Sequence, residues 1–243
     1  MTSEGDRDER APPLASGQVV LVSLFVTALI TAQLTAAKVL SFHVPVSLPV
    51  TGDTRVMPGA ALAYALTYFA TDCYGELYGR RPAQTVVNTG FAMNLVLLVL
   101  VWSTILSPAA PSSIDPGTFR TVLGSSTSIV VGSLCAFVVS QNWDVFVFHA
   151  LRERTNVAHL WLRNVGSTAT SQAIDTVIFV VVGFALAPSV LGGTVLPWSV
   201  IAALVVGQYI LKLLIAVCDT PFVYAVVGFL GDGEGVGAPQ PAD

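Results

Sequence analysis

Hydrophobic positions in this chain gather in long runs, and short polar or proline-containing segments separate the runs. Each run approaches the roughly 20 residues that an α-helix needs to cross about 30 Å of hydrocarbon. The pattern therefore predicts an all-α integral membrane protein with about six transmembrane helices in one bundle. The expected helices cover residues 17–40, 58–78, 82–106, 119–149, 166–187 and 198–219.

Polar segments flank and connect these runs. The fourth run is longer than one crossing requires, so its last part should extend past the bilayer. Residues 43–57 contain the alternation V-P-V-S-L-P-V and the turn signal T-G-D-T, which predict a short extended ribbon or loop at the membrane surface. Pro221 should break or kink the last helix before Leu230. The expected division is a disordered tail over 1–16, a membrane domain over 17–230 and a second disordered tail over 231–243.

Composition supports the membrane class and the charge distribution gives an orientation. Of the 243 residues, 53% are hydrophobic and 11% are charged, against about 25% charged residues in an ordinary soluble domain. The net charge of −4 gives a nucleic-acid partner no electrostatic support. Because basic residues collect on the cytoplasmic side, both termini are expected there. That side carries Arg7, Arg10, Arg80, Arg81, Arg152, Arg154 and Arg163, and the other side carries Lys38, Arg55 and Arg120.

Sequence signatures of enzymes and of metal sites are missing. The chain has no G-x-x-x-x-G-K-[ST] loop, so it carries no ATPase of its own, and it has no G-x-S-x-G nucleophile signature. Its histidines and cysteines lack metal-ligand spacing, and the cysteines are expected to be small core residues. We therefore predict that the protein is not an enzyme and uses neither a metal nor another cofactor. The residues concerned are His43, His149, His159, Cys73, Cys135 and Cys218.

Carboxylates inside the runs are the main candidates for function. Asp72 and Glu76 lie four residues apart on one face of the second predicted helix, below Tyr64 and Tyr68. A charge near the bilayer centre costs about 2.5–3.5 kcal/mol on insertion scales. Capping of helix ends or pairing with arginines explains any single acid equally well. The predicted topology nevertheless brings five acids and one lysine to a similar depth, namely Asp72, Glu76, Asp144, Asp175, Asp219 and Lys212.

A short internal repeat places an amide beside two of these acids. The pattern S-Q-x-x-D-x-x-x-F begins at Ser140 and recurs at Ser171. Acids and amides on different helices suit a polar ligand in an apolar bundle, and nearby aromatic rings favour a flat, hydrogen-bonding heterocycle. For any one amide, including Asn88 and Gln208, a hydrogen bond between helices is the favoured alternative. The predicted ligand-binding residues are Tyr68, Asp72, Glu76, Asn94, Gln172, Asp175, Lys212 and Asp219.

Four motifs together resemble one known family. The first is P-G-A-A-L-A-Y-A-L-T-Y-F-A-T-D-C-Y-G-E-L-Y-G-R-R over residues 58–81, and the second is T-A-A-K over 35–38. The others are R-N-V-G-S-T-A-T-S-Q-A-I-D-T-V-I-F over 163–179 and K-x6-D-T-P-F-V-Y over 212–224. These motifs resemble those of the queuosine precursor transporter family, also described as a vitamin uptake transporter family, over about 17–224. The chain departs from that family at Gly75, where D-x-x-N-E is frequent, so contacts of that amide are not carried over.

The resemblance implies a six-helix importer in the cell membrane for 7-deazaguanine precursors of tRNA modification. Those precursors lead to queuosine in bacteria and to archaeosine in archaea. Two other readings stay open: a substrate-capture subunit that resembles those of energy-coupling-factor importers and needs a separate ATPase, and an intramembrane assembly factor without a ligand. The expected partners are a small-molecule deazapurine and the lipid bilayer, with no nucleic acid. The sequence leaves open the exact base, the coupling ion and the oligomeric state, a homo-oligomer included.

Overall fold

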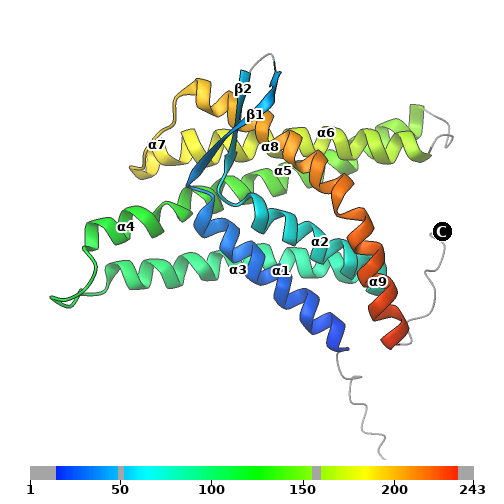
Figure 1. Ribbon diagram of the computed structural model, residues 1–243, viewed down its shortest axis with the longest axis horizontal. Helices are drawn as coiled ribbons and strands as arrows, with labels where there is room; N and C mark the ends of the chain where they lie inside the picture. The colour runs from blue at the N-terminus through cyan, green and yellow to red at the C-terminus, as the bar shows by residue number, and fades with distance from the viewer. Residues whose placement is uncertain (1–14, 49–51, 155–159, 235–243) are drawn as a thin grey trace, which may run out of the picture.

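A computed structural model describes residues 15–48, 52–154 and 160–234. Helices dominate, and a two-stranded antiparallel hairpin projects from the bundle at the top of Figure 1. The elements in chain order are α1 Ser16–Thr35, β1 Val39–Leu48, β2 Gly52–Pro58, α2 Ala61–Tyr78, α3 Arg80–Leu106, α4 Pro116–Gly124, α5 Ser126–Arg154, α6 Leu160–Val181, the π-helix η1 Val182–Leu186, α7 Ala187–Leu191, α8 Trp198–Cys218 and α9 Thr220–Glu234.

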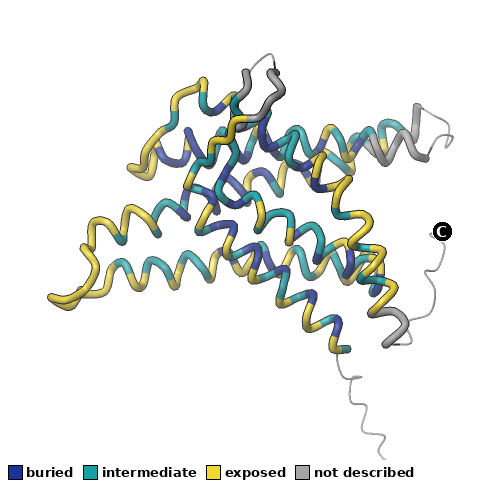
Figure 2. Tube along the Cα trace, viewed as in Figure 1, coloured by how far each residue is buried: buried dark blue, intermediate teal, exposed yellow. Residues whose placement is uncertain are grey.

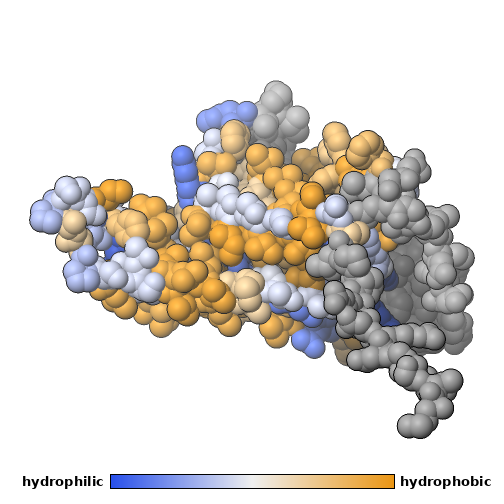
Figure 3. Space-filling model, turned by 90° about the horizontal axis from the view of Figure 1, so that it is seen from below, coloured by the Kyte–Doolittle hydropathy of each residue, from blue (hydrophilic) through white to orange (hydrophobic). Residues whose placement is uncertain are grey.

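Five stretches of the described chain are long and apolar enough to cross a membrane. Apolar side chains cover much of the outer surface of the helices, seen in orange in Figure 3, as expected where a protein faces lipid. The chain is therefore a mostly helical, multi-pass membrane protein. The helix α2 is not among the five stretches, so the count of six spans stays a prediction. The five stretches are Ser16–Thr35, Arg80–Leu106, Pro116–Leu151, Gly166–Leu191 and Trp198–Phe229.

The first helix is shorter than predicted because the chain turns into a strand. It ends at Thr35 rather than at Leu40, and the backbone N–H of Lys38 donates to the Thr35 carbonyl at 3.1 Å. The strand β1 begins directly afterwards, at Val39. It pairs with β2, so the predicted extended ribbon is confirmed as a β-hairpin, whose tip at residues 49–51 lies outside the described residues.

The fourth predicted run is divided into two helices. The short α4 begins after Asp115, whose carboxylate accepts hydrogen bonds from the Thr118 backbone N–H at 2.8 Å and from its hydroxyl at 3.0 Å. These bonds hold the pKa of Asp115 below its usual range. The helix α5 then continues for 29 residues, about 43 Å at 1.5 Å per residue. That length exceeds the hydrocarbon thickness of about 30 Å, in accord with the expected extension past the bilayer.

The last two predicted spans each contain a break in the α-helix. After α6 the backbone forms the π-helix η1, and α7 then carries the helix to Leu191, four residues past the predicted end. The last span breaks at Asp219, between α8 and α9, so the break expected near Pro221 is confirmed. The helix α9 extends to Glu234, and residues 231–234 are helical rather than part of the predicted tail. The remaining tail residues, 1–14 and 235–243, lie outside the described chain.

Two close contacts hold the interior of the bundle together. The helices α5 and α6 run side by side across Figure 1, and a Cβ on Gly132 of α5 would come within 2.8 Å of Gly183 of η1. On α8, a Cβ on Gly207 would collide with the Val56 carbonyl of β2. Figure 2 shows the buried positions, in dark blue, concentrated where these elements meet. The hairpin is therefore packed closely against α8.

Candidate functional site

An ion pair between two helices lies inside the bundle. The Lys212 ammonium of α8 lies 2.5 Å from Oδ2 of Asp175 on α6, and their side chains are only 6% and 19% exposed. The Ser140 hydroxyl of α5 donates to the other carboxylate oxygen of Asp175 at 3.3 Å. One aspartate thus joins α5, α6 and α8. The sequence analysis placed Lys212 and Asp175 at a similar depth, and the structure shows that they pair.

The internal repeat forms a reciprocal contact between α5 and α6. Ser140 of the first copy donates to Asp175 of the second, and Ser171 of the second donates to Asp144 of the first at 3.4 Å. Because the two helices are antiparallel, the copies are related by a local two-fold axis. Lys212 breaks that symmetry, because its ammonium pairs with Asp175 of the second copy. The repeat therefore has a structural role in joining the two helices, and α8 adds a charge to one half.

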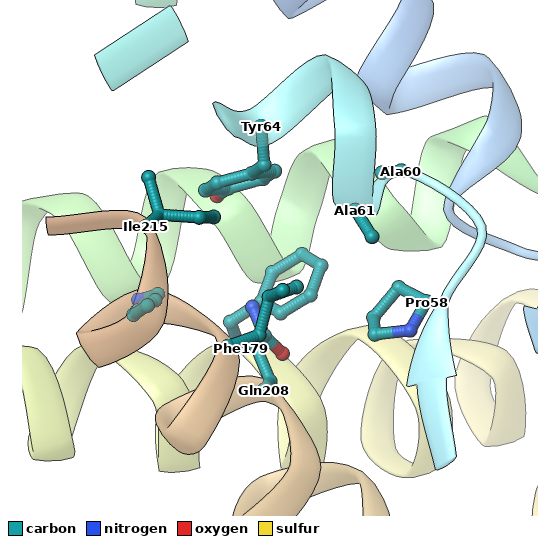
Figure 4. A pocket seen from close by; sticks show the side chains of 9 residues that line it. Pro58, Ala60, Ala61, Tyr64, Phe179, Gln208 and Ile215 are labelled. Carbon is teal, nitrogen blue, oxygen red and sulfur yellow. The ribbon is translucent and has the colours of Figure 1, made fainter. Parts of the chain in front are cut away.

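A small cavity lies directly beside the ion pair, between the base of the hairpin and helices α2, α6 and α8 (Figure 4). The rings of Tyr64 and Phe179 form its walls, with centroids 6.4 Å apart and planes at 52°. The free space within it is about 10 Å³, which is near the least that holds one water molecule. A bicyclic base therefore needs this wall to move. The lining residues are Pro58, Ala60, Ala61, Tyr64, Phe179, Gln208, Leu211, Lys212 and Ile215.

Further polar side chains lie beyond the cavity along α2, first Tyr68 and then the acids Asp72 and Glu76. Tyr68 stacks obliquely on Tyr64 with centroids 5.9 Å apart, and it lies close enough to both Asp175 and Asp72 to interact with their charges. Asp72 in turn interacts with Asp219 and with Glu76. A continuous set of polar groups thus leads from the Lys212–Asp175 pair to the end of α2. Asp72 and Glu76 themselves lie on an exposed face of that helix rather than in the cavity wall.

Several buried polar atoms near this set have no partner among the described residues. They include the side-chain oxygens Oε1 of Gln172, Oε1 of Gln208 and Oδ2 of Asp219. Each of these atoms can accept a hydrogen bond, and an acceptor left unpaired in the interior costs about 1–3 kcal/mol. Of these three residues, Gln208 lines the cavity, and its Oε1 is an acceptor available to a ligand that carries N–H donors.

The predicted site residues fall into three groups in the structure. Lys212 lines the cavity, Asp175 pairs with it, and Tyr68 lies near Asp175. Asp72, Glu76 and Asp219 form a second group that interacts through Asp72, and Gln172 lies on α6 with Asp175 and has an unpaired buried oxygen. Asn94 is different, because it lies on α3, which contributes no residue to the cavity wall.

Sequence reasoning missed the apolar part of the cavity. It did not select Phe179, although this residue ends the second copy of the repeat and lies one helical turn after Asp175. That spacing of four residues was the available signal. Pro58 was missed because its role depends on how the hairpin packs. Gln208 was read as a helix–helix contact, but it lines the cavity.

A second buried polar cluster lies at the junction of α1, α3 and α5. The Gln33 amide of α1 donates from Nε2 to the Ser133 hydroxyl of α5 at 3.3 Å. Asn94 of α3 is fully buried, and Gln33 and Ser133 are nearly so. Within the described residues, Oε1 of Gln33 and both amide atoms of Asn94 lack partners. We call Gln33, Asn94 and Ser133 the amide cluster.

Comparison with known proteins gives one family. The family model described as "Putative vitamin uptake transporter" matches residues 58–226, which include the hairpin end, the cavity wall and the ion pair. The "Probable queuosine precursor transporter" of Bacillus subtilis (strain 168) is 34% identical over 172 residues, covering 70% of this chain and 72% of that protein. No solved structure matches the chain.

Proposed function

Since this chain belongs to the vitamin uptake transporter family, we propose that it imports a 7-deazaguanine precursor of queuosine or archaeosine across the cell membrane. The relative from Bacillus subtilis is named for a queuosine precursor, and this name supports the substrate class. The buried Lys212–Asp175 pair beside a cavity walled by Tyr64 is the observation that carries the proposal. Ionisable groups inside a membrane bundle are rare and mark substrate or ion pathways.

The arrangement assigns a role to each part of the site. The rings of Tyr64 and Phe179 stack on the flat base. The unpaired oxygens of Gln172, Gln208 and Asp219 accept hydrogen bonds from its N–H groups. Lys212 and Asp175, together with the neighbouring Tyr68, form the polar floor of the site, and Asn94 contributes from α3.

Asp72 and Glu76 act on the side of the site that faces away from the hairpin. On α2 they follow Tyr68 by one and two helical turns, and Asp72 interacts with Asp219 at the end of α8. In the predicted orientation this is the cytoplasmic side, where they receive the base as it leaves the cavity. The absence of a P-loop in the sequence means that uptake draws no energy from ATP hydrolysis by this chain.

Binding requires the cavity to open. Its free space is too small for a bicyclic base, so α8 or the side chain of Tyr64 must move when the substrate enters. Because Lys212 ties α8 to α6 through Asp175, the ion pair holds the closed state together. Entry of the base is therefore expected to loosen this pair, which couples ligand binding to a movement of α8.

Uptake of radiolabelled 7-deazaguanine by liposomes that contain only the purified chain tests the proposal. We expect uptake by the natural chain and a loss of at least about tenfold for Asp175→Asn, because Lys212 then lies buried without a counter-ion. Asp115→Asn is the matched control, since that aspartate caps α4 away from the site, and it should transport normally.

The same assay separates the alternatives. Binding of the base without uptake would favour a capture subunit that depends on a separate ATPase. Failure to bind or transport 7-deazaguanine would rule out the proposed function. Equal uptake by Asp175→Asn and the natural chain would mean that transport does not need the ion pair.

A further inference from the structure

The amide cluster contains three buried polar groups that the described chain does not satisfy. The Oε1 of Gln33 and the Oδ1 and Nδ2 of Asn94 all lack partners there, and the two side chains are 1% and 0% exposed. Each such group costs about 1–3 kcal/mol relative to a paired one. Buried amides without partners are uncommon in native proteins and call for a ligand or a bound water.

Helix contacts near the cluster indicate how its members lie relative to one another. A Cβ on Gly90 of α3 would collide with Phe25 and approach Leu29 of α1, and Asn94 and Gln33 each follow one helical turn after these contact positions. On the other side, Phe91 of α3 stacks on Phe137 of α5 with ring centroids 4.0 Å apart.

The contact with α5 leads to the same level independently. Since α3 and α5 run in opposite directions, as Figure 1 shows, one turn forward from Phe91 corresponds to one turn back from Phe137. That step reaches Ser133, which already accepts the hydrogen bond from Gln33. Both helix contacts thus place Asn94 of α3 near the level of the Gln33–Ser133 hydrogen bond.

Tyr64 separates this point from the cavity. Its ring forms a wall of the cavity, as Figure 4 shows, while the hydroxyl interacts with Ser133 of the amide cluster. The ring thus has the cavity on one side and the amide cluster at its tip. A movement of Tyr64 would extend the cavity toward the amide cluster and provide the room that the closed cavity lacks.

We propose that Gln33 and Asn94 are the specificity-determining residues of this transporter and bind the hydrogen-bonding edge of the base. Because Nε2 of Gln33 is engaged by Ser133, its Oε1 is left as an acceptor. Together the unpaired groups supply one donor, Nδ2 of Asn94, and two acceptors, Oδ1 of Asn94 and Oε1 of Gln33. This inference rests on the proposed function and adds the residues that select the base.

The donor of Asn94 and the two acceptors of Asn94 and Gln33 are complementary to the hydrogen-bonding edge of a guanine-type base. Such an edge presents a carbonyl acceptor followed by a ring N–H and an exocyclic NH₂, that is, one acceptor and two donors. An adenine-type edge presents an amino donor beside a ring-nitrogen acceptor and leaves at least one of the protein groups unpaired. A site built to bond particular N–H and C=O groups rejects analogues that lack them, because its own buried groups then stay unsatisfied.

Binding of two probes to the purified full chain in detergent tests the inference. The natural chain should bind 7-deazaguanine at least about tenfold more tightly than 7-deazaadenine. Asn94→Leu should weaken binding of 7-deazaguanine by about tenfold or more and leave 7-deazaadenine nearly unaffected, so that the discrimination is lost. Gln33→Leu should act in the same direction as an independent second variant.

Asn88→Leu is the matched control. Asn88 lies on the same helix as Asn94, but it is exposed and bonded to Gln84 at 3.0 Å, so its replacement should leave both affinities unchanged. In the absence of ligand, Asn94→Leu should have a Tm equal to or above that of the natural chain, because it removes unpaired polar atoms.

Two results would overturn the inference. One is unchanged discrimination in both Asn94→Leu and Gln33→Leu, which would leave the cluster as a water site or a helix contact. The other is a marked fall in Tm for Asn94→Leu, which would mean that Asn94 has partners within the protein. Failure of the natural chain to bind 7-deazaguanine is a separate result, which refutes the proposed function itself.

Discussion

At the scale of single residues, the ion pair between Lys212 and Asp175 ties α8 to α6. Their side chains are almost buried and lie 2.5 Å apart, and Ser140 satisfies the second carboxylate oxygen. Charges in a low-dielectric interior are tolerated when they are paired, but the loss of one partner leaves the other uncompensated. The pair is thus expected to behave as a unit, in which each charge depends on the other.

Lys212→Met should therefore destabilise the protein by about 3–5 kcal/mol, whereas the double variant Lys212→Met with Asp175→Asn should recover a large part of that loss. Unfolding of the natural chain, the two single variants and the double variant in mild detergent gives the coupling energy directly. Additive effects of the two single changes, with no recovery in the double variant, would contradict a coupled buried pair.

At the scale of elements, the hairpin depends on one residue of the helix that it packs against. The backbone of Val56 in β2 passes so close to Gly207 of α8 that no Cβ fits there. The adjoining Pro58 closes one side of the cavity. The contact therefore sets how far α8 lies from the hairpin and, through α8, where Lys212 lies.

Gly207→Ala should lower the free energy of unfolding by about 1–3 kcal/mol, because the new methyl group overpacks the hairpin contact. The matched control is Gly228→Ala on α9, where an added Cβ meets nothing within 4 Å. There the change should be neutral or stabilise by about 0.5–1 kcal/mol, since alanine is the better helix former. Thermal unfolding of both variants decides the point, and equal effects at the two glycines would refute the proposed close packing.

At the scale of the whole molecule, the helices alternate in direction so that the predicted cytoplasmic ends gather at one end of the bundle. The start of α1, the junction of α2 with α3 and the end of α9 lie toward the right of Figure 1, and the loop from α3 to α4 lies toward the left. The arginine pair Arg80 and Arg81 begins α3 at the first of these ends. The arrangement agrees with the positive-inside pattern.

The orientation can be tested with single cysteines in a chain whose native cysteines are replaced by alanine. Ser113→Cys, in the exposed α3–α4 loop, should react with a membrane-impermeant maleimide added to intact cells. Gln84→Cys, on the exposed first turns of α3, should react after the cells are opened. The reverse pattern would invert the predicted topology.

Much of the fold could be predicted from local sequence. A membrane helix makes its backbone hydrogen bonds within itself, so it can be recognised from the length and apolarity of one segment. The helices α3 and α8 begin and end close to the predicted positions for that reason. The break at Asp219 also follows from local chemistry, since Pro221 cannot donate within a helix. The π-helix η1 and the division of the fourth run at Ser125 had no such local signal.

Polar candidates for the site could be listed from the sequence, but their contacts and the apolar cavity wall could not. The sequence by itself determined that this is a membrane protein of one recognisable family, with rare carboxylates, amides and one lysine inside its spans. Only the tertiary structure decided that Lys212 of α8 pairs with Asp175 of α6. It also brought Gln33 of α1 to Ser133 of α5. The physical reason is that the composition of a span is a local property, whereas the rotation and depth of each helix depend on packing against its neighbours.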